Sequence, residues 1–210
     1  DVMEDEATED MEKMAAMLPS EHPYMRSTPI EIWKNRIPWL LLLMVSATLT
    51  GIVITKFEDS LAVLPCLTAF IPMLMDTGGN SGSQACVSII RGISLNEIEF
   101  RDLGKVVWKE IRVSVLCGVC LAVACFAKIV VVDMLLLKSG SVSYMVAFVV
   151  CATMAVTVCL AKIVGSTLPL LAKKLGFDPA VMASPIITTI VDFLSLLVYF
   201  AFATAMLGIG

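Results

Sequence analysis

Long hydrophobic segments alternate with short polar ones along almost the whole chain. A helix that crosses the roughly 30 Å hydrocarbon layer of a bilayer needs about 20 mostly apolar residues. Five segments reach that length between charged or turn-forming residues, at about 37–54, 61–90, 113–137, 143–171 and 180–208. None repeats the alternation of a barrel strand, so the pattern predicts an all-α integral membrane protein with five transmembrane helices.

Composition agrees with this prediction. Hydrophobic residues make up 58% of the 210 residues, more than the core of one soluble domain of that length needs. The surplus indicates lipid as the surrounding solvent and leaves membrane enzymes, transporters and channels open. Residues 1–36 are predicted to form a cytoplasmic connecting segment, and residues 37–210 the membrane domain.

Lys and Arg are concentrated on one side of the predicted spans. Cytoplasmic loops near membrane ends are enriched in these residues. The pattern therefore predicts a cytoplasmic N-terminus and a C-terminus outside. The basic residues of the predicted cytoplasmic side are Lys34, Arg36, Arg91, Arg101, Lys105, Lys109, Arg112, Lys173 and Lys174, whereas the other side has Lys56 and Lys138, with Lys128 near it.

The first 18 residues combine an acidic composition with apolar residues at helical spacing. The apolar positions are Met3, Ala7, Met11, Met14 and Leu18, which predicts a short amphipathic helix. Its acidic face is either a solvated surface or a carboxylate cluster that binds a hard divalent cation. Because such a helix needs an apolar surface to dock on, and the sequence does not open on Met, we expect a soluble region to precede it.

Cysteine and histidine offer little chemistry in the predicted spans. The seven cysteines lie almost wholly inside them, so structural disulfides are not expected. Cys117 and Cys120 form a C-x-x-C pair without a second ligand pair, which favours helix packing over a zinc site. The single histidine, His22, lies in a linker. With no histidine to pair with Ser83 or Cys86, a membrane enzyme is disfavoured.

Asp192 lies about 20 Å along the fifth predicted span, close to the middle of the bilayer. An ionised group at that depth needs a partner, a water-filled cavity or a bound ion. We favour a polar stripe that lines water. The alternative is that Ser and Thr bond their own backbone and that Asp192 pairs with a basic residue, for which we consider Lys128. The stripe consists of Ser184, Thr188, Asp192, Ser195 and Tyr199.

The second predicted span contains small and polar residues between positions 72 and 84. Three glycines and a proline at mid-membrane predict a break in this helix, whose freed carbonyls would serve as oxygen ligands. The alternative is that Gly78, Gly79 and Gly82 only let neighbouring helices approach closely. That alternative does not account for Asp76 and Asn80.

Side-chain oxygens of the same span recur at helical spacing, at Asp76, Asn80 and Gln84. Carboxylate, amide and carbonyl oxygens suit hard cations such as magnesium, calcium and manganese. We therefore predict a cation site at which Asp192 holds a largely hydrated ion, bridged by water to Asn80 and to nearby carbonyls. The candidate metal ligands are Asp76, Gly78, Gly79, Asn80, Thr188, Thr189, Asp192 and Ser195.

The run from Phe70 to Gln84 resembles the signature of the MgtE family of bacterial magnesium channels. The sequence 178–180, followed by Pro185, Thr189 and Asp192, resembles the last helix of that family, and residues 36–40 resemble the entry to its first helix. The resemblance covers essentially the whole chain. It implies a homodimer of five-helix subunits in the lipid bilayer, with one pore on the two-fold axis. The second and fifth helices would line this pore, and Asp192 would be its aspartate.

The resemblance also implies a function and a regulatory part. The function is a channel that passes hydrated Mg²⁺ through the inner membrane into the cytoplasm, without an enzymatic activity or a nucleic-acid partner. Residues 1–18 resemble the end of a regulatory cystathionine-synthase-type module that leads into a pore-plugging helix, and the family's regulatory domains lie outside this sequence. A sodium- or proton-coupled secondary transporter is the alternative, because it would use the same broken helix.

Overall fold

The computed structural model describes residues 2–20, 22–182 and 184–209, and every regular element among them is helical. The elements are α1 (Val2–Met14), α2 (Pro29–Lys56), α3 (Glu58–Val63), η1 (Pro65–Phe70), α4 (Ile71–Ser94), η2 (Phe100–Asp102), α5 (Leu103–Lys128), η3 (Ile129–Leu136), α6 (Tyr144–Lys174), η4 (Pro179–Met182) and α7 (Ser184–Leu207). The predicted all-α class is confirmed for this part of the chain.

Four helical segments are long and apolar enough to cross a membrane, at Pro29–Lys56, Phe100–Leu136, Tyr144–Lys174 and Pro185–Leu207. They correspond to the first, third, fourth and fifth predicted spans. The second predicted span is divided into α3, η1 and α4. Helix α4 has 24 residues but carries the polar run, so its passage through the membrane stays a prediction.

Local sequence explains where these helices begin. Thr28 caps α2, because its hydroxyl oxygen accepts from the Glu31 N–H while the Glu31 carboxylate accepts from the Thr28 N–H. Ser143 caps α6 by accepting from the Val146 N–H at 3.2 Å. Gly176, with φ of +82°, allows the tight turn that ends α6 and leads to η4.

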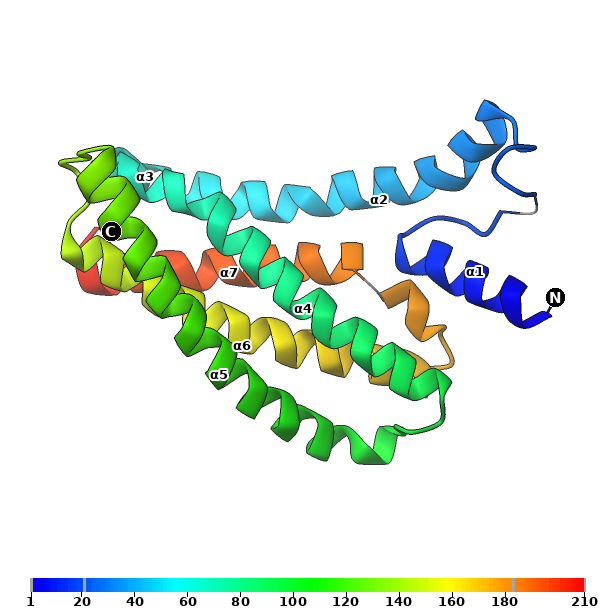
Figure 1. Cartoon of the computed structure of the whole chain (residues 1–210). Coiled ribbons are helices and arrows are strands. Elements are labelled where there is room, and N and C mark those ends of the chain that lie inside the picture. The colour runs from blue at the N-terminus through cyan, green and yellow to red at the C-terminus, as the bar shows by residue number, and fades with distance from the viewer. Residues whose placement is uncertain (1, 21, 183, 210) are drawn as a thin grey trace.

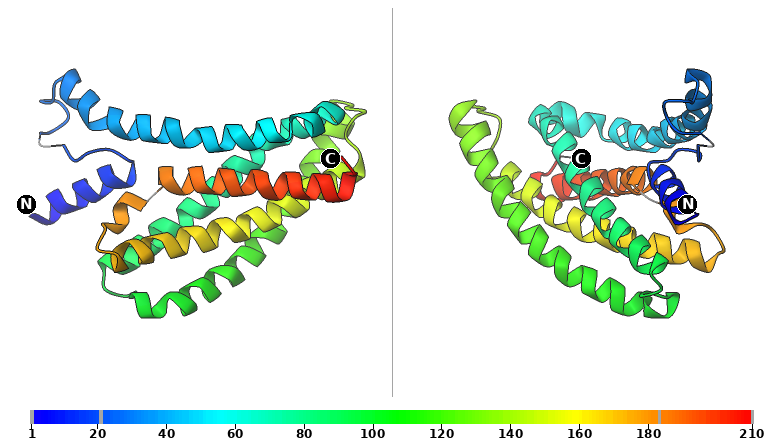
Figure 2. Two further views of the ribbon diagram at one scale, coloured as in Figure 1. Left: turned by 180° about the vertical axis from the view of Figure 1, so that it is seen from behind. Right: turned by 45° about the vertical axis from the view of Figure 1, so that its right-hand side comes forward.

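Helices α4, α6 and α7 pack against one another at the centre of the bundle (Figure 1). Helix α5 covers α6 on one side, and α2 lies along α7 on the other. Figure 2 shows that α2 stands apart from the rest over much of its length. Val53 is its one buried residue in the described part, so most of the surface of α2 is free to contact lipid or another chain.

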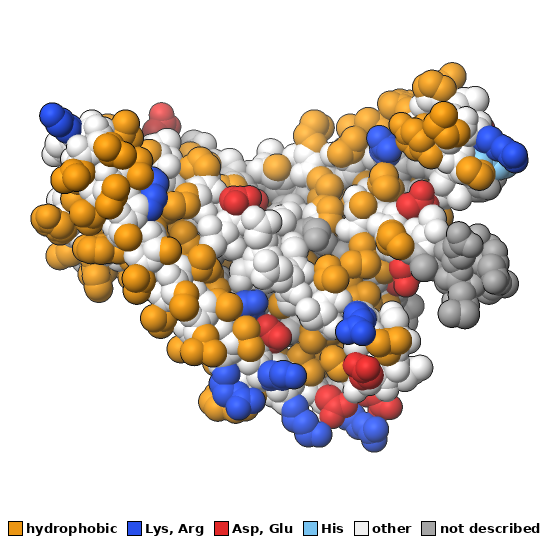
Figure 3. Space-filling view, in the orientation of Figure 1, with side chains coloured by type: hydrophobic (Ala, Val, Ile, Leu, Met, Phe, Trp, Pro, Cys, Tyr) orange, Lys and Arg blue, Asp and Glu red, His pale blue; other side chains and the backbone are white. Residues whose placement is uncertain are grey.

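The connections group at two ends of the bundle (Figure 1). One end has α1 and the α4–α5 and α6–α7 connections, and the other has α3, the η3–α6 connection and the C-terminus. We name them the inner and outer ends after the predicted orientation, which stays a prediction. Figure 3 shows Lys and Arg gathered near the start of α5 at the inner end and hydrophobic side chains over much of α5 and α2.

The predicted break of the second span at mid-membrane is wrong, because α4 is continuous through the glycine run. Pro72 lies in the first turn of α4, where its missing N–H disturbs no bond of that helix. A Cβ at Gly78 would lie 2.7 Å from Thr157 Cγ2, and a Cβ at Gly79 would lie 2.9 Å from Thr188 Cγ2. The glycines therefore permit close helix packing, which was the alternative interpretation.

Helix α1 is formed as predicted over its described residues and contacts the inner end of the bundle. Met14 packs against an apolar cluster that contains Cys86, Ile187 and Val191. Met11, in contrast, is exposed, and the side chains of residues 3 and 7 lie outside the described ones. The docking surface that we expected for this helix therefore includes the membrane domain itself.

Candidate ion-binding groove

An open groove of about 480 Å³ lies between α4 and α7. Residues 72, 76 and 80 follow one another at intervals of four and so share one face of α4, and residues 188 and 192 share one face of α7. Two carboxylates, one amide and one hydroxyl thus border the same space. The groove is lined by Ile71, Pro72, Met75, Asp76, Gly79, Asn80, Thr188 and Asp192.

The groove brings together five of the eight predicted ligand residues, and it is formed by side chains more than 100 positions apart in the sequence. Asp76 and Asn80 are exposed in the single chain, and Thr188 and Asp192 are half-buried. If α4 crosses the membrane as predicted, its exposed carboxylate and amide must face water, an ion or another chain, because lipid cannot satisfy them. The five residues are Asp76, Gly79, Asn80, Thr188 and Asp192.

The other three predicted ligand residues are not among those that line the groove. Gly78 is buried against Thr157, Val191 and Ser195. The Ser195 hydroxyl is 1% exposed and donates to the Val191 carbonyl at 2.6 Å. Thr189 donates to a backbone carbonyl of its own helix. The predicted polar stripe of α7 is therefore divided between the groove and the protein interior.

The backbone carbonyls near Gly78 and Gly79 are not free to act as ligands as we predicted, because the continuous α4 uses its carbonyls in helical hydrogen bonds. What the groove does offer is side-chain oxygen. The Thr188 hydroxyl donates to the Pro185 carbonyl at 3.0 Å, which leaves lone pairs on its oxygen. Within the described residues no group of three or more His, Cys, Asp or Glu could hold a metal ion.

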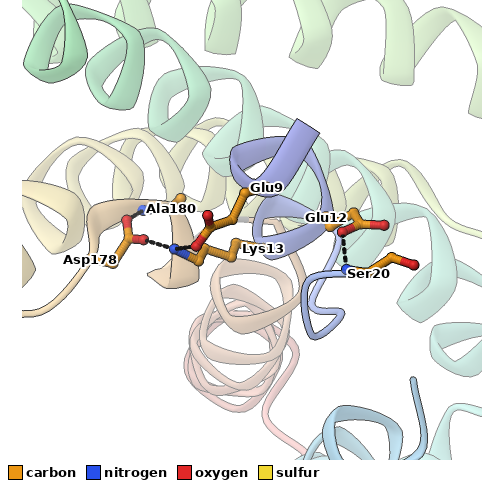
Figure 4. Close-up of polar contacts among 6 residues, drawn as sticks. All are labelled: Glu9, Glu12, Lys13, Ser20, Asp178 and Ala180. Carbon is orange, nitrogen blue, oxygen red and sulfur yellow. Dashed lines mark hydrogen bonds and ion pairs between the residues drawn. The ribbon is translucent and has the colours of Figure 1, made fainter. Parts of the chain in front are cut away.

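An ion-pair network joins α1 to the segment that precedes α7 (Figure 4). Lys13 Nζ lies 2.6 Å from Asp178 Oδ2 and 2.6 Å from Glu9 Oε1, and the Ala180 N–H donates to Asp178 Oδ1 at 2.9 Å. Glu12 accepts from the Ser20 N–H at 2.7 Å. These Glu9 and Glu12 contacts are with the protein, and a cation-binding role for the acidic face stays a prediction.

Both partners of this network have shifted pKa values. Desolvation raises the pKa of Asp178, but hydrogen bonds from Lys13 and the Ala180 N–H outweigh it and hold that pKa below its ordinary value. Hydrogen bonds to Asp178 and Glu9 raise the pKa of Lys13. The charged forms of Lys13 and Asp178 are therefore both favoured. Their ion pair holds α1 at the inner end of the helix that carries Asp192.

Our sequence reasoning overlooked Lys162, although it is a basic residue within the fourth predicted span. Its side chain is 5% exposed, and it has no hydrogen bond or ion pair with the described residues. It shares a face of α6 with Cys159, which accepts from Ser114 of α5, and with Ala155, which lies against Gly118 of α5. Lys162 also lies one turn from Gly165, which faces Gly82 of α4, so it is positioned between α4 and α5 and is not among the residues that line the groove.

The fold and the groove define an integral membrane protein whose regular elements are helical over the described residues, with a line of side-chain oxygens between two of its helices. Residues 71–202 match the MgtE family, described as divalent cation transporters. The match covers α4 to α6 and most of α7. The chain belongs to this family, as its sequence motifs predicted.

Named relatives support the same membership. The chain is 32% identical to the magnesium transporter MgtE of Thermus thermophilus and 33% identical to that of Bacillus subtilis, each over 207 residues. The match covers 99% of this chain and 44% of each of these relatives. The Enterococcus faecalis magnesium transporter MgtE is 29% identical over 204 residues, 97% of this chain and 43% of that protein. The chain thus spans less than half the length of these relatives.

Proposed function

We propose that this chain is the membrane part of a magnesium channel and that Mg²⁺ passes along the groove between α4 and α7. The observation that carries the proposal is that Asp76, Asn80, Thr188 and Asp192 line one groove in a bundle of apolar helices. The relatives named as magnesium transporters agree with it. Transport runs from the outer to the inner end, which we place in the cytoplasm.

The working unit is a homodimer with the groove of each copy on a shared two-fold axis. In one chain the groove is open and Asp76 and Asn80 are exposed, so a second copy would close it and remove these groups from lipid. Two copies of Asp192 would then face each other. Their two negative charges balance one dication and hold it more strongly than a monovalent ion.

Mg²⁺ gives up its water reluctantly and needs nearly ideal octahedral geometry. The ion is therefore held at Asp192 with much of its hydration shell, and Asn80 and Thr188 contact that water. The groove supports this proposal, since its oxygens are spread over two helices and do not form a compact cage. Selection then acts on the hydrated ion.

A coupled secondary transporter is the rival function. Such transporters characteristically bind ions at helices that are broken near mid-membrane. The continuous α4 removes this feature, which the sequence had predicted for both classes, so gradient dependence of uptake is what distinguishes them. Residues 1–36, which reach the inner end of α7 through Lys13, would connect the pore to the additional regulatory domains that we infer.

Flux through the purified protein in liposomes tests the proposal. We expect Mg²⁺ uptake, followed with an enclosed fluorescent indicator, to be abolished by Asp192→Ala and to be independent of sodium and proton gradients. Asp59→Asn is the matched control, because Asp59 is an exposed carboxylate of α3 at the outer end and is not among the residues that line the groove. Unchanged Mg²⁺ uptake in Asp192→Ala would exclude the assignment of the groove. Uptake that follows an imposed sodium or proton gradient would favour the coupled transporter.

A further inference from the structure

The hydrogen-bond pattern of the backbone changes at the outer end of the groove, where η1 passes into α4. The segment η1 is a 3₁₀-helix, and Pro72 in the first turn of α4 has no N–H to donate to the Thr68 carbonyl. The Ile71 N–H donates to that carbonyl instead. In a continuous α-helix the Ile71 N–H would donate to the Leu67 carbonyl. Here it donates to Thr68, so the Leu67 carbonyl does not receive this backbone hydrogen bond.

Tyr199 of α7 supplies another donor to that carbonyl. Its hydroxyl lies 3.0 Å from the Leu67 carbonyl oxygen, and both residues are 0% exposed. A buried hydroxyl costs free energy unless it forms a hydrogen bond, and the ring alone would pack equally well as phenylalanine. The specific contribution of the Tyr199 hydroxyl is therefore its bond to the backbone at the turn into α4.

This bond lies close to the groove along both helices. Tyr199 follows Asp192 by two helical turns, about 10 Å along α7. Leu67 is followed by Ile71 and Pro72, which themselves line the groove, and then by Asp76. Tyr199 is fully buried and is not among the residues that line the groove, so it can act on Asp76 only through the position of α4.

A second contact, from the end of α5, restrains the same turn. Phe70, the last residue of η1, is 1% exposed, and Lys128 Nζ lies 5.4 Å from the centre of its ring. Lys128 is in turn held by Asp133 at 2.8 Å, in the π-helical segment η3 that continues α5. The turn into α4 is thus restrained by contacts with both α7 and the end of α5.

We propose that Tyr199 is a positioning residue of the ion path, whose hydrogen bond to the Leu67 carbonyl fixes the first turn of α4 against α7 and so sets the spacing of Asp76 and Asp192. This proposal rests on the proposed function of the groove. A carboxylate pair at fixed spacing discriminates between strongly hydrated Mg²⁺ and Ca²⁺, which accepts more ligands and looser geometry. Without the bond the spacing varies, and that discrimination falls.

The test compares Mg²⁺ and Ca²⁺ uptake by the purified protein in liposomes. We expect Tyr199→Phe to lower the ratio of Mg²⁺ to Ca²⁺ uptake by about three- to tenfold, the range that one buried hydrogen bond spans in an equilibrium constant. Amide hydrogen exchange of residues 64–75 should be faster in the same variant, because the turn has lost a restraint. Tyr144→Phe, at a position 70% exposed, should match the wild type in both measurements.

Leu170→Ala separates positioning from general stability. Leu170 is 0% exposed and packs with Ile89 and Ile93 in a cluster that contains neither Tyr199 nor Leu67, so the variant lowers the thermal stability and keeps the bond to Leu67. We expect its uptake ratio to stay at the wild-type value. An unchanged ratio in Tyr199→Phe, or an equal change in Leu170→Ala, would overturn the positioning role.

Failure of the proposed function gives a different result. If the wild type takes up no divalent cation, the function proposed for the groove is overturned. In that case amide hydrogen exchange still tests whether the Tyr199 bond fixes the first turn of α4. Faster exchange at residues 64–75 in Tyr199→Phe, but not in Leu170→Ala, supports the fixing of α4, and equal exchange in all three proteins rejects it.

Discussion

Gly165 of α6 lies directly against the backbone of Gly82 of α4, and a Cβ on Gly165 would overlap the Gly82 carbonyl group. This contact sets how closely α4 and α6 approach near the centre of the bundle. Gly82 also has Ile187 of α7 on another side. The position of α4, and with it one wall of the groove, therefore depends on two residues that have no side chain.

The first prediction concerns this contact. Gly165→Ala should destabilise the protein by about 1–3 kcal/mol, because the backbone of α4 must move to admit the methyl group. Thermal unfolding in detergent measures the effect. Gly104→Ala is the matched control, since a Cβ there meets no atom within 4 Å and alanine favours the helix. Equal midpoints for Gly165→Ala and the wild type would show that the two helices are less tightly packed than described.

The second prediction concerns the link between Lys13 and Asp178. Asp178→Asn should weaken the docking of α1 by up to about fivefold, because a partly exposed ion pair contributes at most about 1 kcal/mol. A spin label attached to Met11→Cys reports the mobility of α1, since Met11 is 66% exposed. Lys105→Met, which breaks an exposed ion pair with Asp102, should leave the mobility unchanged. Equal mobility in Asp178→Asn would mean that α1 is held by Met14 alone.

The third prediction is the pH dependence of the same link. The pKa of Asp178 is lowered in the folded protein, so its contribution is present above the ordinary value of 3.8 and is lost as the pH falls through the lowered pKa. The pKa of Lys13 is raised, so its contribution is present below 10.5 and is lost as the pH rises through the raised pKa. Docking of α1 should thus be constant between about pH 4 and 10. A mobility change of the spin label near neutral pH would contradict this.

The groove allows a comparison between neighbouring threonines. Thr188 and Thr189 both donate to the Pro185 carbonyl at 3.0 Å, but only Thr188 lines the groove among the described residues. Thr188→Val should lower Mg²⁺ uptake in liposomes by about three- to tenfold, because a water-binding oxygen is replaced by a methyl group. Thr189→Val is the matched control with the same chemical change. Similar uptake in the two variants would argue against a role of Thr188.

Sequence alone located most of the groove because helical periodicity is a local property. The spacing of Asp76 and Asn80, and of Thr188 and Asp192, places each pair on one helix face before any tertiary contact is known. What the sequence could not decide is which partner each face meets. Ser195 and Tyr199 have the right spacing for the polar stripe of α7, yet α4 and the Leu67 turn cover them.

The glycine run shows the same limit for backbone structure. Local propensity predicts a break there, because glycine is a poor helix former. The structure instead has a continuous helix whose glycines face Thr157, Thr188 and Ala161 of the neighbouring helices. The interruption that does occur is at Leu64, whose backbone is not helical, between the end of α3 and the start of η1 at Pro65. Tertiary packing decided between two interpretations that the sequence left open.

The last prediction concerns Lys162, a buried lysine in a membrane helix. Its side chain is 5% exposed and has no ion pair with the described residues, whereas the buried side-chain atoms without a hydrogen-bond partner there are Ser83 Oγ and Thr157 Oγ1, so the amine keeps some access to solvent. Lys162→Met keeps the length of the side chain and should leave Mg²⁺ uptake unchanged while keeping or raising the midpoint of thermal unfolding. Asp192→Asn, measured in parallel, should abolish uptake at a similar midpoint. Loss of uptake in Lys162→Met would place this residue in the ion path, and a marked loss of stability would reveal a buried acidic partner. Either result would require a further polar group near Lys162.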